Sequence, residues 1–137
     1  MKERGKFFIF EGVGGSGKST QAELSTNYLN SIGEETVLRR EPGGIQEAVQ
    51  IRELIFKFKS ENLINADHQL AFFFAAREIW KNSIVIPNRE NGLHIVSDRS
   101  YPATNAYQGY GEGGNLEQIE KISKSVMQNC MPSGIVL

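Results

Sequence analysis

The stretch G-V-G-G-S-G-K-S, residues 12–19, decides the fold, and Thr20 follows it directly. It matches the phosphate-binding loop G-x-x-x-x-G-K-[ST] at every fixed position. The apolar run Lys6–Phe10 precedes it and is typical of a strand buried on both faces, and a helix-like run, Lys18–Ser31, follows it. This order of strand, glycine loop and helix is the context that phosphate binding needs. The simpler alternative is a glycine-rich turn ahead of an ordinary helix.

The chemistry of such a loop is anion capture. Its glycines let successive backbone N–H groups curl around phosphate oxygens, and the N-terminus of the following helix adds its positive dipole end. Lys18 is placed to reach the β- and γ-phosphates, and the Ser19 hydroxyl is placed to contact Mg²⁺. The residues predicted to bind a nucleoside triphosphate are Gly12, Val13, Gly14, Gly15, Ser16, Gly17, Lys18, Ser19 and Thr20. The sequence contains no N-K-x-D guanine motif, which argues against a GTPase.

Composition limits the class of protein. A chain of 137 residues with 39% hydrophobic residues is long enough for one core, and we predict a single domain over residues 1–137. The net charge of −1 provides no general attraction to nucleic acid or membrane, so neither is predicted as a partner. The single cysteine, Cys130, is interpreted as a buried structural thiol. With no leader-like or long apolar segment in the sequence, we expect a cytoplasmic location.

Strands are expected along the whole chain. Besides the run before the glycine loop, apolar runs predict strands at Thr36–Arg39, at Leu93–Ser97 and from Ile135 to Leu137. Strands that alternate with helices pair in parallel through right-handed crossovers. We therefore predict an α/β P-loop NTPase fold of three layers, α/β/α, with a parallel sheet whose carboxyl edge binds the ligands.

Helices are expected between these strands. The first carries the apolar stripe Leu24, Tyr28 and Ile32 and ends at Gly33. Pro87 is expected to kink a later helix or to start a separate short one. Further helices are predicted from the apolar spacing of Ala48, Ile51, Ile55 and Phe58, from a cap at Asn65 or Asp67, and from a capping-box pattern at Asn115 and Gln118.

Two polar clusters follow predicted strands. Arg39 and Arg40 stand on the turn that continues through Glu41–Gly44, where guanidinium forks can bind a phosphate group. A solvated charged turn is the alternative. Asp98 can orient the water shell of Mg²⁺, and Arg99 can contact a transferring phosphate, although an ordinary surface ion pair explains this dipeptide as well.

A third cluster combines aromatic rings with an arginine. Phe72–Phe74 stand on a predicted helix, and Arg77 follows Phe73 at i+4, so that these two side chains share a helix face. A ring can stack on a nucleobase while a guanidinium hydrogen-bonds its edge. Taken alone, such an aromatic run in a helix is more often part of a core.

Taken together, these segments resemble the thymidylate kinases, which transfer the γ-phosphoryl group of ATP to dTMP. The resemblance covers nearly the whole chain. The matching segments are F-x-F-E-G-x-x-G-x-G-K-S-T at Phe8–Thr20, R-E-P-G-G at Arg40–Gly44, F-F-A-A-R at Phe73–Arg77, and D-R-S-Y-P-A-T-N-A-Y-Q-G-Y-G at Asp98–Gly111. The last of these is the most specific, because a phosphate loop alone occurs in many kinases and GTPases.

The resemblance implies a role for each matching residue. Phe73 stacks on thymine and Arg77 hydrogen-bonds it, while Tyr107 lies under the sugar and favours deoxyribose. The implied substrate-binding residues are Glu11, Arg40, Phe73, Arg77, Arg99, Thr104 and Tyr107. The implied catalytic residues are Lys18, Asp98 and Arg99, and the implied Mg²⁺ contacts are Ser19 and Asp98. ATP is then the phosphoryl donor, with Mg²⁺ as cofactor.

Some positions depart from the family pattern. Gly14 stands where a carboxylate commonly contacts the sugar 3′-hydroxyl, Ser100 replaces an aromatic residue or histidine, and Ala103 replaces a small polar residue. Gly15 indicates the subgroup whose catalytic arginine lies in a lid. That lid, a fifth strand and an adenine loop are expected beyond the fourth strand, so we expect the C-terminal part of the fold to be missing from this sequence.

The resemblance also implies a homodimer formed by the helices that follow the second and third strands. The residues expected to supply its apolar surface are Ile51, Ile55, Phe58, Phe72 and Trp80.

Two other functions stay open at this point. One is a nucleoside monophosphate kinase of different specificity, and the other is a nucleotide-binding protein without catalytic activity.

Overall fold

The computed structural model describes residues 3–41 and 43–137, and the predicted Pro42 turn therefore lies partly outside the described residues. Its strands are β1 (Phe7–Phe10), β2 (Thr36–Arg40), β3 (His94–Asp98) and β4 (Gly134–Val136). They pair in parallel in the order β2-β3-β1-β4. The parallel sheet is thus confirmed, with the fourth strand beside the strand that leads into the glycine loop.

The register aligns the carboxyl ends of three strands. Phe10 of β1 and Arg40 of β2 both lie opposite Asp98, the last residue of β3. The residues that come next in the chain, Glu11, Glu41 and Arg99, consequently start from one edge of the sheet. This is the edge at which parallel sheets bind ligands.

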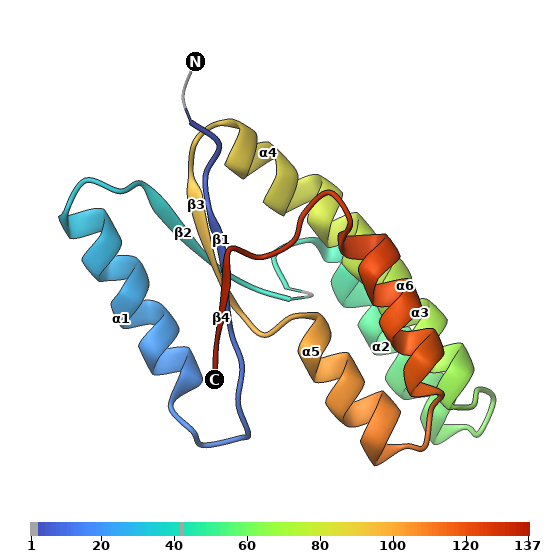
Figure 1. Cartoon of the computed structure of the whole chain (residues 1–137). Coiled ribbons are helices and arrows are strands. Elements are labelled where there is room, and N and C mark those ends of the chain that lie inside the picture. Colours follow the sequence, from blue (N-terminus) through green and yellow to red (C-terminus); the bar gives the residue numbers. More distant parts are fainter. Residues whose placement is uncertain (1–2, 42) are drawn as a thin grey trace.

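One face of the sheet is covered by α1 (Lys18–Ser31) (Figure 1). The helix forms over the predicted residues, but its contact face differs from the apolar stripe noted above. Ala22 and Thr26 are buried, whereas the three stripe residues are exposed. The small Ala22 packs against Phe10 and Val96, which lets α1 approach the strands closely. Leu24 and Tyr28 are partly exposed because they line an apolar hollow beside Val136 of β4. The stripe residues, with their exposed fractions, are Leu24 at 55%, Tyr28 at 63% and Ile32 at 56%.

The opposite face is covered by the remaining helical segments, which places the sheet in the middle of three layers (Figure 1). The α-helices on this side are α2 (Gln46–Ser60), α3 (Ala66–Trp80), α4 (Ile86–Glu90), α5 (Tyr101–Thr104) and α6 (Leu116–Met127). Two π-helical turns, η1 (Lys81–Val85) and η2 (Asn105–Gly111), continue α3 and α5. The predicted three-layer α/β arrangement is confirmed.

The core on this second face is aromatic and aliphatic. Phe7 of β1 packs against Trp80, with ring centroids 6.2 Å apart, and Cys130 is fully buried in the same cluster. Burial raises the pKa of the Cys130 thiol, as expected for a structural cysteine. Trp80 and Ile55 are each only 1% exposed, so these two residues stabilise the protomer and are unavailable to a dimer surface.

Local signals explain how these helices begin. Asn65 caps α3 by accepting from the His68 N–H, and Asn115 caps α6 by accepting from the Gln118 N–H. Pro87 follows the π-helical turn η1, and the backbone stays helical from α3 through η1 into α4, so Pro87 lies within a continuous helical segment. The predicted caps at Asn65 and Asn115 are therefore confirmed, whereas α4 is not a separate helix, because it continues α3 through η1. Across the described residues, we find no helix with both the length and the apolar character needed to cross a membrane.

Candidate active site

The glycine loop joins β1 to α1 with its backbone open to ligands. Gly15 and Gly17 have φ angles of 78° and 86°, a left-handed conformation that L side chains rarely adopt. Gly12 has a φ of 157°, and a Cβ there would lie 2.6 Å from Ser16 Oγ, so a side chain at this position would displace the Ser16 hydroxyl. Gly14 differs from these residues because its φ lies outside the left-handed region, and a Cβ there would meet no heavy atom within 4 Å.

The start of α1 suits an anion. Gly17 is its N-cap and provides no side-chain hydrogen bond, and the first turn holds no acidic residue. The first N–H groups of the helix are therefore left to a ligand in the loop, where the helix dipole favours negative charge. Lys18 is the first residue of this helix and is half-buried beside the loop.

Ser19 and Asp98 meet beside this loop. The Ser19 hydroxyl donates to Asp98 Oδ2 over 2.5 Å, and the buried Asp98 Oδ1 has no partner among the described residues. Asp98 is 6% exposed. No cluster of three or more His, Cys, Asp or Glu side chains suited to a metal ion occurs in the described parts of the chain. Mg²⁺ keeps several waters and accepts few protein ligands, so a hydroxyl and an unpaired carboxylate oxygen beside a phosphate loop fit this ion.

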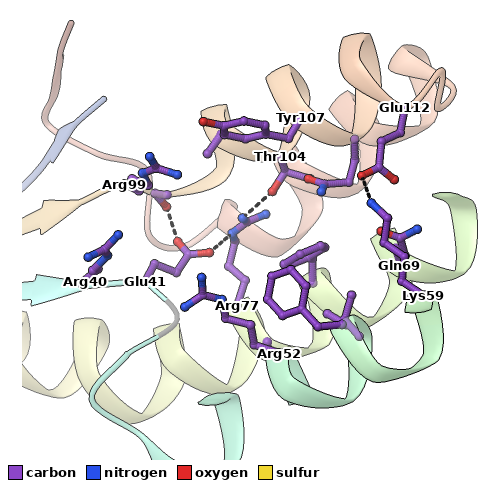
Figure 2. A pocket seen from close by; sticks show the side chains of 17 residues that line it. Arg40, Glu41, Arg52, Lys59, Gln69, Arg77, Arg99, Thr104, Tyr107 and Glu112 are labelled. Carbon is purple, nitrogen blue, oxygen red and sulfur yellow. Dashed lines mark hydrogen bonds and ion pairs between the residues drawn. The ribbon is translucent and has the colours of Figure 1, made fainter. Parts of the chain in front are cut away.

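A cavity of about 310 Å³ opens at the same edge of the sheet, between α2, α3 and the α5–η2 segment (Figure 2). It brings together most of the residues predicted to bind substrate. The predicted residues that line it are Arg40, Phe73, Arg77, Arg99, Thr104 and Tyr107. Arg39, the other arginine of the pair after β2, instead donates to the carbonyl oxygen of Leu38.

Arg77 is the central side chain of this cavity. It is 3% exposed, and its Nε donates to Glu41 Oε1 over 2.5 Å while its Nη2 donates to Thr104 Oγ1 over 2.7 Å. Figure 2 shows Glu41 and Thr104 flanking the guanidinium group. Arg77 Nη1 is buried and has no hydrogen-bond partner among the described residues. A buried donor without a partner in a ligand-sized cavity is suited to an acceptor atom of a ligand.

Glu41 is a site residue that the sequence analysis missed. Its side chain is 6% exposed and forms an ion pair with Arg77, which balances a charge that would otherwise be buried alone. The position of Glu41 in the sequence could have identified it, because a residue directly after β2 lies at the ligand-binding edge of the sheet. The two arginines of the same turn, Arg39 and Arg40, are the stronger signal for phosphate binding in the sequence.

Arg99 is held in an unusual backbone conformation. Its φ is 74°, in the left-handed region, and its carbonyl oxygen accepts from Ser97 Oγ over 2.7 Å. Its guanidinium carbon lies 5.7 Å from the centre of the Tyr107 ring, which is half exposed. Backbone strain of this kind is found where a side chain must be aimed, here into the cavity.

This conformation gives a prediction for Arg99→Gly. We expect this variant to be more stable than Arg99→Ala by about 1 kcal/mol, because glycine adopts the left-handed region without the Cβ clash. Both variants lose the guanidinium group and should bind anions in the cavity equally poorly. Urea unfolding measures the first effect, and phosphate titration by NMR measures the second. Equal stability of the two variants would argue against strain at this position.

Glu11 lies behind the cavity. It follows β1, is 8% exposed, and its Oε1 accepts from the Ser100 N–H over 2.8 Å. Burial raises the pKa of the Glu11 carboxyl group, although hydrogen bonds from the backbone of Ser100 and Ala103 oppose this shift. The structure therefore brings Glu11 together with the cavity wall through Ser100.

A sequence model described as Thymidylate kinase matches residues 10–137. The chain belongs to the thymidylate kinase family. The thymidylate kinase of Ruthia magnifica subsp. Calyptogena magnifica is 38% identical over 135 residues, which cover 98% of this chain and 65% of that protein. The thymidylate kinase of Chlorobaculum parvum is 39% identical over 123 residues, covering 90% of this chain and 56% of that protein.

A solved structure agrees with this family membership. The crystal structure of thymidylate kinase from Ehrlichia chaffeensis matches with a TM-score of 0.84 and 34% identity, over 97% of this chain and 75% of that chain. The P-loop NTPase fold predicted from the glycine loop is thereby confirmed. The chain spans between 56% and 65% of the length of these two curated thymidylate kinases.

Proposed function

We propose that this chain carries the phosphate-donor and acceptor sites of a kinase that transfers the γ-phosphoryl group of ATP to dTMP, giving dTDP and ADP. The observation that carries the proposal is the alignment of the strand ends. It sets the glycine loop after β1 at the same edge as the cavity that holds Arg77. Phosphoryl transfer depends mainly on positioning and charge stabilisation, which two sites on one edge can supply.

On the donor side, the loop from Gly12 to Gly17 binds the phosphates of ATP through its N–H groups, and Lys18 reaches the β- and γ-phosphates. Ser19 and Asp98 would hold Mg²⁺. When bound, this ion neutralises charge that develops on the phosphates. Asp98 is suited to this role because its Oδ1 has no partner among the described residues.

On the acceptor side, the cavity receives dTMP. Phe73 stacks on the thymine ring, and Arg77 donates from Nη1 to a carbonyl oxygen of that ring. Arg40 and Arg99 bind the dTMP phosphate, and Tyr107 lies under the sugar. The placement of the side chains supports this orientation of dTMP. Arg77 and Phe73 come from one face of α3, where they can contact the base, whereas Arg40 and Arg99 stand at the strand ends, where they can contact the phosphate.

Phe73→Ala tests the acceptor site. Stacking of a base on an aromatic ring is worth about 1–3 kcal/mol, so the affinity for dTMP should fall by roughly tenfold or more. Isothermal titration calorimetry with dTMP measures this change. Phe73 is only half-buried at the cavity wall, and we therefore expect a modest loss of stability.

Phe72→Ala is the matched control. Phe72 is half-buried on the same helix but pairs with Phe58, with ring centroids 6.1 Å apart. Its truncation should lower the free energy of unfolding and leave dTMP affinity unchanged. A large loss of stability in Phe73→Ala with unaltered dTMP binding would show that Phe73 is a core residue.

A homodimer and a cytoplasmic location stay predictions. Burial of Ile55 and Trp80 in the protomer removes two of the five apolar side chains expected at the dimer surface. The other three, Ile51, Phe58 and Phe72, are half-buried and can still contribute to it.

A further inference from the structure

Ser100 departs from the family pattern, and the structure indicates what this side chain does. It follows Arg99 as the N-cap of α5 and is 2% exposed. Its N–H donates to Glu11 Oε1 over 2.8 Å, and its hydroxyl donates to Glu41 Oε2 over 2.5 Å. Ser100 therefore connects two carboxylates, one after β1 and one after β2.

The contacts continue from Glu41 to the ligand-facing arginine. Glu41 Oε1 accepts from Arg77 Nε, and Arg77 Nη2 donates to Thr104 Oγ1. These side chains are nearly inaccessible to water, which strengthens each hydrogen bond. With two of its nitrogens engaged, Arg77 keeps Nη1 for a ligand.

The Ser100 hydroxyl decides how the Glu41 carboxylate is oriented. Each buried carboxylate oxygen needs a donor, and Glu41 has one for each: Arg77 for Oε1 and Ser100 for Oε2. Without the hydroxyl, Oε2 is left buried and unpaired. The nearest remedy is rotation of the carboxylate onto the guanidinium group, because Arg77 is the adjacent cation. Such a rotation would draw Arg77 away from the cavity.

We propose that Ser100 is a positioning residue for ring recognition: its hydroxyl holds Glu41 so that Arg77 presents Nη1 to a carbonyl oxygen on the ring of the ligand. The inference rests on the proposed function, since it takes thymine as that ring. Ser100 acts through Glu41 and Arg77. Its loss should therefore weaken recognition of the ring while recognition of the sugar phosphate is kept.

The test titrates the wild-type chain, Ser100→Ala and Ser100→Thr with dTMP and with 2-deoxyribose 5-phosphate. The second ligand keeps the sugar and phosphate but has no ring for Arg77 to contact. In Ser100→Ala we expect the Kd of dTMP to rise about tenfold, the effect of one lost hydrogen bond to a charged group. The Kd of 2-deoxyribose 5-phosphate should not change. Ser100→Thr restores the hydroxyl and should bind dTMP nearly as the wild type does.

Several results would overturn the inference. An equal loss of affinity for both ligands in Ser100→Ala would indicate general loosening of the cavity, and unchanged dTMP affinity would show that the hydroxyl has no part in recognition. If a folded Ser100→Thr variant binds dTMP as weakly as Ser100→Ala does, the hydroxyl likewise has no part in recognition. A wild-type chain that fails to bind dTMP would contradict the proposed function itself. If the wild type binds dTMP and Ser100→Ala binds it equally well, only the role of Ser100 is contradicted, and the proposed function stands. Thermal unfolding of each variant verifies the fold.

Discussion

Lys18→Ala is expected to weaken the binding of ATP with Mg²⁺ by at least about a hundredfold, because two charge-assisted hydrogen bonds worth about 1.5–3 kcal/mol each are lost. The loop in the variant keeps its glycines and its N–H groups, so only the cation is removed. Isothermal titration calorimetry with ATP and Mg²⁺ measures the affinity. Phosphoryl transfer to dTMP should fall with it, since the same ammonium group meets the charge that develops on the γ-phosphate.

Lys121→Ala is the matched control for this prediction. Lys121 is exposed on α6, away from the glycine loop, and its replacement removes the same charge from the protein. We expect its ATP affinity to equal that of the wild type. No hydrogen bond or ion pair of the Lys18 side chain is found among the described residues, so Lys18→Ala should also unfold at the wild-type temperature. Unchanged ATP affinity in Lys18→Ala would refute the assignment of the loop.

The donor side could be predicted from the sequence because its chemistry is local. The loop, the lysine and the start of α1 are consecutive residues, and backbone geometry alone orients their N–H groups. Asp98 was predicted to follow a strand; it is the last residue of β3 and accepts from Ser19. Parallel strands bring such positions together whatever the rest of the chain does.

The acceptor side could be predicted only in part, because its contacts join distant residues. Phe73 and Arg77 were found from their helical spacing, and both line the cavity. The partner of Arg77 lies 36 residues away at Glu41, and the contact between Ser100 and Glu41 spans 59 residues. No local pattern connects these positions. The register of β2 against β3 places Glu41 beside Ser100, and the packing of α3 brings Arg77 to Glu41.

Two elements show where local signals fail. The stripe on α1, which includes Leu24 and Tyr28, follows helical spacing, yet Ala22 makes the close contact with Phe10 and Val96. Leu24 and Tyr28 instead line an apolar hollow beside Val136 of β4 and stay more than half exposed. The segment Tyr101–Gly111 is helical without having been predicted as a helix. Its glycines disfavour a helix, but Thr104 and Gln108, both buried, lie on one face that lines the cavity, where Thr104 accepts from Arg77.

The buried ion pair supplies the largest expected effect on stability. Glu41→Ala should lower the free energy of unfolding by about 3–5 kcal/mol, because removal of one partner leaves the Arg77 charge buried and uncompensated. The Glu41 side chain is 6% exposed and that of Arg77 is 3% exposed, so water can screen neither group effectively. Urea denaturation of both proteins at neutral pH measures the difference.

A second substitution separates the charge from the packing at this site. Arg77→Met removes the charge while filling similar space, and replacing a buried ion pair by apolar groups is often neutral. We therefore expect Glu41→Ala combined with Arg77→Met to regain most of the stability that Glu41→Ala loses, although dTMP affinity should stay low because Nη1 is gone. If instead the two substitutions add without coupling, the Glu41 carboxylate does not compensate Arg77. The stability of the cavity wall would then come from the packing of α3 alone, and Glu41 would have no part in holding the guanidinium group toward the ligand.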